Sequence, residues 1–477
     1  MSTSTLTIRA QRSAASRPGV RPLFSESVLT FWVPLALISA ALFALEHSTI
    51  YASLEYQLGN ESQDLAQDVG GSNLARQVAA IAIGAMGIAL LARRSQVPME
   101  LNWRLLAPII ALCAWITASA LWSDDAALSL KRSLLPELLI VGAFGLAKHL
   151  RPIELCMFTA IIGTGSIMLG VAVEVVSGTF LRSGEYRFSG TLDPNIQGVY
   201  CAALCLASAC LAADPLTASK PWRRAMWLML FALGGVFLLL TQSRTSTAAL
   251  IVGLVVVYAL GLPWRRKVLI AGIVGPIIAA GLILLLSAER GKDVAVNAAL
   301  LGRSQETSDL GTLTGRVNIW DRVIGDIAER PLTGYGYGGF WTTERVMSYT
   351  RVLDWEFNHA HSVYLESLLN AGFIGLVLGL LIVIMALASA GRTFLRTHDY
   401  GYLFIAALLA LALVHGLLDS NFVIVGFAPL LGMLCIAVVV LHGGSAVRQP
   451  ASTSPSADNQ PARLERSPQR IRQLETT

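Results

Sequence analysis

The sequence predicts an all-α membrane protein: a polytopic transmembrane helical bundle of about 12 spans with one large extracytoplasmic loop carrying short helices. Hydrophobic residues make up 54% of the 477 residues and charged residues only 14%, with a mean hydropathy of +0.59. A soluble domain has a far more polar composition. Apolar runs long enough to cross a hydrocarbon core of ~30 Å recur along the chain, and the loops between them alternate in charge.

Apolar runs define the predicted spans. The run at 133–147 is the weakest, because it is short and contains Pro136 and Glu137. All six cysteines lie inside apolar runs, where we expect small packing residues rather than a disulfide or metal framework. The candidate spans are residues 28–45, 74–92, 104–121, 133–147, 153–176, 195–212, 225–241, 244–261, 267–287, 363–390, 400–417 and 421–442.

The charge of the loops predicts the orientation. If the amino terminus is cytoplasmic, the inner loops are basic, which is the bias expected of cytoplasmic loops. Both termini are then cytoplasmic, and the protein is a multi-pass membrane protein, of the inner membrane if the cell is a Gram-negative bacterium. The inner loops carry Arg93, Arg94 and Arg104, Lys148 and Arg151, Lys220, Arg223 and Arg224, Arg265, Arg266 and Lys267, and Arg392 and Arg396; the outer ones carry Glu46, Glu55, Glu61, Asp64, Asp68, Asp124, Asp125 and Asp419.

This topology divides the chain into five parts. The amino-terminal part is basic and lacks aspartate, and the carboxy-terminal part is rich in Ser, Pro, Gln and Arg, which is typical of disordered tails. The parts are a cytoplasmic arm at 1–27, nine spans at 28–287, a large periplasmic loop at 288–361, three spans at 362–442, and a disordered cytoplasmic tail at 443–477.

The large loop contains a predicted amphipathic helix that ends at Pro331. Val317, Trp320, Ile324 and Ile327 recur at helical spacing, with charged residues between them. Such a helix either lies on the membrane surface or over a cavity, or packs on the bundle for stability. The sequence leaves both alternatives open.

Two further patterns in the loop are candidate binding elements. The segment 334–340 alternates glycine with aromatic residues, so Tyr335 is a candidate for stacking on a sugar ring, although interfacial turns have the same composition. His359 and His361 are two of only seven histidines. They would share one face of a strand but diverge by about 200° on a helix. Catalysis, a metal site and a plain interfacial role all remain open, and no clear ligand spacing supports the metal.

Arginines beside the spans indicate an anionic ligand. Arg244 joins two apolar runs with hardly any loop, so its charge is held at the edge of the bilayer, where it needs a partner. Arg187 and Arg132 lie in or beside other outer loops. Guanidinium groups on one membrane face suit phosphate or pyrophosphate. Structural pairing with Asp124, Asp125 or Asp193 is the alternative for each of them.

Together these elements resemble the O-antigen ligase/polymerase family of bacterial membrane glycosyltransferases, over roughly residues 100–440. Ser362 departs from the family pattern, in which asparagine is commoner. The matching pieces are Leu121-Trp122-Ser123-Asp124, the Arg187…Gly190…Asn195 loop, Ser243-Arg244, Gly315-Arg316…Trp320…Pro331-Leu332-Thr333-Gly334-Tyr335-Gly336, and His361-Ser362 with a nine-residue spacer before Gly372-Phe373-Ile374-Gly375.

The resemblance implies an inverting, metal-independent glycosyltransferase without a cofactor. The donor would be an oligosaccharide on undecaprenyl pyrophosphate, and the acceptor a glycan or lipid A-core hydroxyl on the periplasmic face. His361 would be the general base, and Arg187 and Arg244 would stabilise the departing pyrophosphate. Arg132, Arg316, His359 and Tyr335 complete the expected substrate-binding set.

A secondary transporter or flippase of lipid-linked glycan is the rival hypothesis, since twelve spans are also typical of transporters. Transporters place charged residues near the bilayer midplane and often contain inverted repeats. In this sequence the arginines and histidines of the predicted outer face dominate, apart from a possible mid-span Glu137, and no repeat is evident.

Overall fold

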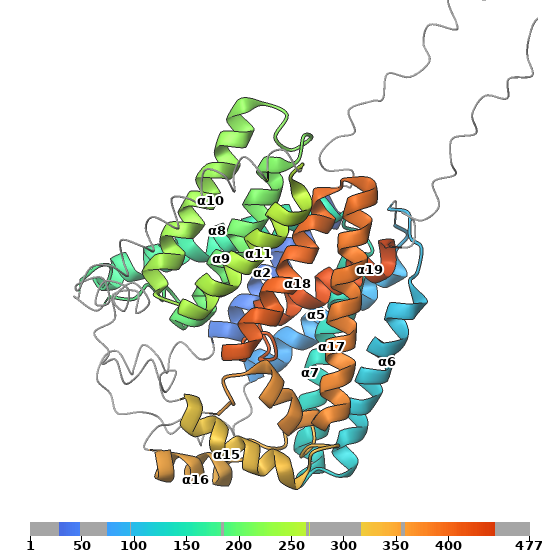
Figure 1. The fold of residues 1–477 in the computed structure, drawn as a ribbon, viewed down its shortest axis with the longest axis vertical. Coiled ribbons are helices and arrows are strands. Elements are labelled where there is room, and N and C mark those ends of the chain that lie inside the picture. Colours follow the sequence, from blue (N-terminus) through green and yellow to red (C-terminus); the bar gives the residue numbers. More distant parts are fainter. Residues whose placement is uncertain are drawn as a thin grey trace, which may run out of the picture.

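In a computed structural model, residues 28–47, 74–95, 97–182, 186–263, 267, 316–353 and 358–443 are described (Figure 1), and every regular element in them is a helix. The all-α prediction is therefore confirmed. The elements are α2 (Val28–His47), α5 (Leu74–Ala92), α6 (Trp103–Ala118), the short 3-10 helix η1 (Ser119–Leu121), α7 (Ala126–Ala147), α8 (Pro152–Ser177), α9 (Pro194–Ala213), α10 (Pro221–Thr241), α11 (Arg244–Gly261), α15 (Arg316–Glu329), α16 (Thr343–Leu353), α17 (Val363–Thr397), α18 (Tyr400–Leu418) and α19 (Phe427–His442).

The helices confirm a multi-pass membrane protein. Within the described ranges, eight helices are long and apolar enough to cross a membrane, and apolar stretches in α2 and α19 are shorter. The weak predicted run at 133–147 belongs to a longer helix, α7, which begins at Ala126 and includes Lys131, Arg132 and Glu137. The predicted span 267–287, the arm 1–27 and the tail from 444 lie outside the described residues.

Predicted cytoplasmic segments meet at one end of the bundle, which we call the far end. The ammonium group of Lys148 donates to the Leu91 carbonyl at 2.6 Å. His442 Nε2 lies 2.8 Å from the Ala147 carbonyl, and Glu100 N donates to the Leu441 carbonyl at 2.9 Å.

Predicted outer segments meet at the opposite end, which we call the site end. The Glu46 carboxylate accepts hydrogen bonds from Phe427 N at 2.8 Å and from the Tyr200 hydroxyl. The indole of Trp122 donates to the Thr333 carbonyl at 3.2 Å. Helices α15 and α16 lie at this end (Figure 1).

Helices α9 and α18 form the centre of the bundle. Of their spanning residues, 83% and 67% respectively are buried, against 17% for α10. Small residues let neighbouring helices approach closely; a Cβ added at Gly234 of α10 would lie 2.9 Å from the sulfur of Cys205. The six cysteines are free and mostly buried, which confirms their expected packing role.

The polar loop has a hydrophobic core of its own. Ile319 and Val323 of α15 are fully buried against Tyr335, Phe340 and Trp341. Ile324 is 55% exposed, so the buried face of α15 is rotated from the predicted one. Helix α15 packs against α17, and of the two alternatives left open by the sequence the structure shows the packed helix.

A break in α17 joins this loop to the bundle. Gly372 has φ +65° and ψ −169°, which interrupts the helix. The backbone groups released by the break pair with the loop: Phe373 N donates to the Pro331 carbonyl and Tyr335 N to the Leu369 carbonyl, both at 2.8 Å. The Pro331–Gly336 and Gly372–Gly375 motifs are therefore two halves of one contact.

Replacing Gly372 should detach this contact. An alanine there would be strained by the positive φ, and its Cβ would overlap the Leu332 carbonyl. We expect Gly372→Ala to destabilise the protein by about 2 kcal/mol or more, measured as unfolding of the purified protein in detergent. Gly379→Ala in the same helix is the matched control, because a Cβ at Gly379 meets nothing within 4 Å. Equal stability of the two variants would contradict the assigned role of Gly372.

Candidate functional site

Three predicted arginines come together at the site end. Arg187 precedes α9, Arg244 begins α11 and Arg316 begins α15. Burial lowers the pKa of Arg187 and of Arg316, and the positive charge of Arg244 lowers both further. Guanidinium groups from three distant segments therefore form one positively charged site.

The Arg187 loop is shaped by the carboxylate of Glu174. This buried side chain accepts hydrogen bonds from Ser189 N at 3.1 Å, from Gly190 N at 2.7 Å and from the Tyr186 hydroxyl. The Arg187 guanidinium itself donates to the Thr241 carbonyl at 3.1 Å and to the side-chain oxygen of Asn195 at 3.3 Å. Hydrogen bonds to residues of α9 and α10 therefore fix the direction of the Arg187 side chain.

Arg244 occupies the first position of a helix. Gln242 has φ +51°, so the chain turns sharply from α10 into α11 without a longer loop. Ser243 caps α11, its hydroxyl accepting from Ser246 N at 3.4 Å. A helix amino terminus disfavours a cation and attracts an anion. The placement of Arg244 there concentrates positive potential at one point.

The negative charge of Asp193 raises the pKa of Arg187 and of Arg316 and so opposes the effects of burial and of Arg244. The other carboxylate beside this cluster is Asp419. Its oxygen lies 3.8 Å from the Arg316 guanidinium, and its side chain is 4% exposed. Burial raises the pKa of Asp419 to about 6, although the charge of Arg316 opposes the shift. In the sequence Asp419 was visible only as an acidic residue of an outer loop, and no spacing linked it to Arg316.

His359 and His361 face each other, with ring centroids 4.1 Å apart. The intervening Ala360 is pinned at both peptide groups: its N–H donates to Glu366 at 2.9 Å, and its carbonyl accepts from the Trp320 indole at 3.0 Å. His361 has φ +50°, a left-handed conformation that favours glycine and that often marks functional sites. The pair adopts neither of the regular conformations considered from the sequence.

The histidines belong to the arginine site. Burial lowers the pKa of both imidazoles well below the ordinary value, and the charge of Arg316 lowers them further. Both rings are therefore neutral near pH 7, and a neutral imidazole carries one nitrogen lone pair that can accept a proton.

His415, which the sequence did not single out, also lies here. Its Nε2 is 3.2 Å from the Ser246 hydroxyl, two residues after Arg244. Its ring contacts Phe422, with centroids 5.7 Å apart. A histidine within an apolar run was the signal that could have found it.

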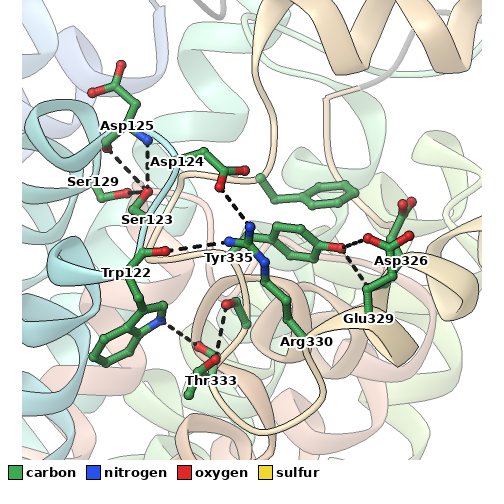
Figure 2. A network of polar contacts seen from close by, with 12 residues as sticks. Trp122, Ser123, Asp124, Asp125, Ser129, Asp326, Glu329, Arg330, Thr333 and Tyr335 are labelled. Carbon is green, nitrogen blue, oxygen red and sulfur yellow. Dashed lines mark hydrogen bonds and ion pairs between the residues drawn. The ribbon is translucent and has the colours of Figure 1, made fainter.

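Tyr335, which the sequence analysis expects to bind substrate, lies among charged side chains of the loop (Figure 2). The ring is 2% exposed. The guanidinium carbon of Arg330, seen over the ring in Figure 2, lies 4.7 Å from its centroid, and that of Arg345 lies 4.5 Å from it. Both arginines pair with Asp124, at 2.9 and 3.2 Å. The ring of Tyr335 is therefore covered by the two arginines that fasten the loop to the Trp122–Asp125 corner through Asp124.

Arg132 has a similar structural place. Its guanidinium donates to the Gly338 carbonyl, with the Trp341 carbonyl at 3.4 Å. It holds the glycine-rich segment against α7, rather than joining the cluster of Arg187, Arg244 and Arg316. Of the alternative carboxylate partners, Asp124 pairs with Arg330 and Arg345, and Asp125 is the one whose charge acts on Arg132.

The carboxylate of Glu366 is fully engaged in contacts within the loop. Its carboxylate accepts from the Trp341 indole at 3.0 Å and from the Asn370 amide at 3.0 Å, besides Ala360 N. Among the described residues, no three histidine, cysteine or acidic side chains form a metal-ligating group. Glu366 therefore holds the histidine segment in place.

These features define a class: a multi-pass membrane protein that holds buried cations and neutral imidazoles in one polar site at one end of its helical bundle. Residues 226–380 match the family model described as O-Antigen ligase. The chain is 27% identical over 221 residues to the exopolysaccharide production protein ExoQ of Rhizobium meliloti, covering 43% of this chain and 46% of that protein.

Both comparisons confirm the resemblance to the O-antigen ligase/polymerase family, an enzyme class, that the motifs predict. The matched segment contains Arg244, Arg316 and both loop histidines. The chain spans less than half the length of ExoQ.

Asp419 should give the protein a specific pH dependence of stability. Since its pKa is raised from 3.8 to about 6, the folded state holds this proton more tightly than the unfolded chain does. Its contribution to the free energy of unfolding therefore falls by about 3 kcal/mol as pH rises through roughly 4 to 6.

The measurement compares wild type with Asp419→Asn by unfolding in detergent at both ends of this window. We expect the variant to gain about 3 kcal/mol relative to wild type as pH rises. His359 and His361, whose lowered pKa values act in the opposite direction, are common to both proteins. A difference between the two proteins that does not change with pH would contradict the assignment.

Proposed function

We propose that this protein is an inverting membrane glycosyltransferase that moves a glycan from undecaprenyl pyrophosphate to an acceptor hydroxyl on the periplasmic face. The observation that carries the proposal is the electrostatic coupling of Arg244, Arg316 and the two loop histidines in one site. The family match over 226–380 supports the reaction class.

The arginines suit the leaving group. The pyrophosphate would approach the amino terminus of α11, where Arg244 and the helix dipole both favour an anion. Arg187, held by Thr241 and Asn195, would contact the same group. Stabilisation of this kind is worth about 10²- to 10³-fold in rate per donor.

His361 suits the general base. Its neutral imidazole would take the proton of the acceptor hydroxyl while the oxygen forms a bond to the anomeric carbon. The bond from that carbon to the pyrophosphate oxygen breaks, and the electron pair leaves with the pyrophosphate. Attack opposite to the leaving group inverts the anomeric carbon. Binding of the anionic donor would also offset the charge of Arg316 and raise the pKa of His361 toward a more basic value.

An apolar cavity beside the site supports a lipid-linked donor. It has a volume of about 290 Å³ and lies between α6, α7, α17, α18 and α19. Val363 and Tyr364, next to the histidine segment, line it, and so does Phe422, which contacts His415. A polyprenyl chain whose pyrophosphate lies on the arginines would have apolar walls within reach.

The match to an exopolysaccharide production protein favours polymerisation over ligation, with a second lipid-linked glycan as acceptor rather than lipid A-core. The basic far end supports cytoplasmic termini in the inner membrane and a periplasmic site. No metal or other cofactor is part of the proposed reaction.

The test is transfer in vitro with the purified protein and a defined lipid-pyrophosphate donor. His361→Gln should lower kcat/KM by about 10² to 10⁴ while donor binding is retained. His398→Gln is a matched control, because His398 also has a positive φ, +54°, but lies at the far end of α17.

Full transfer by His361→Gln would contradict the proposed base. Movement of the donor across a bilayer without glycan transfer by wild type would favour the transporter instead.

A further inference from the structure

The far end of the bundle contains a second hollow, separate from the proposed catalytic site. Its volume is about 780 Å³. The walls come from residues 100–105 at the start of α6, from the last turns of α17 and from Gly443 after α19. Helix α17 runs from the histidine segment at the site end to this hollow.

The charge of the hollow is positive. Arg104, Arg392 and Arg396 line it, against one carboxylate, that of Glu100. Among the described residues, no ion pair joins any of these three arginines to a carboxylate. The Arg392 guanidinium donates only within its own helix, to the Ala388 carbonyl at 3.1 Å. The hollow therefore offers three guanidinium groups to a ligand with negative charge.

Backbone hydrogen bonds fix one wall of the hollow. Glu100 N donates to the Leu441 carbonyl at 2.9 Å, and Asn102 N donates to the Val440 carbonyl at 2.8 Å. These bonds fix the segment before α6 on the end of α19. The arginines of α17 therefore face a wall of defined shape across the hollow.

Apolar groups lie beside the cations. Trp103 is 64% exposed and Leu101 is 39% exposed, and Met385 lines the wall from α17. Tryptophan at the end of a spanning helix is typical of the headgroup region of a membrane. A free anion would leave this apolar surface uncovered, whereas a lipid covers it.

We propose that this hollow binds the headgroup of an anionic phospholipid from the leaflet opposite the catalytic site. The phosphate would contact Arg104, Arg392 and Arg396, and the acyl chains would lie along Trp103. Basic pockets between spanning helices bind such headgroups in other membrane proteins. The inference does not depend on the proposed glycosyl transfer.

The test uses the full chain, purified in a neutral detergent, with native mass spectrometry to measure bound phosphatidylglycerol against phosphatidylcholine. Wild type should retain the anionic lipid selectively. An Arg104→Gln, Arg392→Gln, Arg396→Gln variant should bind it about a hundredfold more weakly, and the corresponding Arg→Lys variant should keep most of the affinity. Soluble glycerol phosphate in excess should not displace the lipid.

The matched control is Arg223→Gln, Arg224→Gln. These arginines follow the exposed Trp222 at the start of α10, so this helix end also combines a tryptophan with arginines. Neither of the two arginines lines this hollow. Unfolding in neutral detergent checks that the triple variant is folded. Unchanged binding by the folded triple variant, an equal loss in the control, or displacement by glycerol phosphate would each overturn the proposal.

Discussion

Mutual repulsion of buried guanidinium groups is the constraint on which the rest of the structure depends. Arg187, Arg244 and Arg316 are close enough for the charge of Arg244 to lower the pKa of the other two, and one carboxylate, Asp419, lies at 3.8 Å from Arg316. Such a cluster is stable only if the surrounding backbone fixes each residue. The same concentration of guanidinium groups suits a polyanionic donor.

Residues outside the cluster, several of them carboxylates, hold the arginines and histidines in position. Glu174 shapes the Arg187 loop, and Glu366 pins the peptide between the histidines. Asp124, through Arg330 and Arg345, clamps Tyr335 and with it the polar loop. The break at Gly372 supplies the backbone groups that receive the loop. Each of these contacts positions a functional side chain by holding the residues next to it.

Much of this organisation could be predicted from the sequence. Hydropathy gave the helices, and the alternation of loop charge sorted segments to the two ends, because both signals are local. The structure places Arg187, Arg244, Arg316, His359 and His361 at one end of the bundle. The surroundings of Tyr335 and Arg132 could not be predicted, because their partners Arg330, Arg345 and the Gly338 carbonyl are set by tertiary contacts that no local spacing records. Asp419 and His415 were missed for the same reason.

The central claim is that one anion-binding site joins the arginines to the imidazoles. The most direct measurement is a cryo-EM structure of the protein with a non-transferable polyprenyl pyrophosphate analogue. The account predicts pyrophosphate density in contact with Arg187 and Arg244, with the anomeric position facing His361. Density at another part of the molecule, or an anomeric position turned away from both histidines, would contradict it.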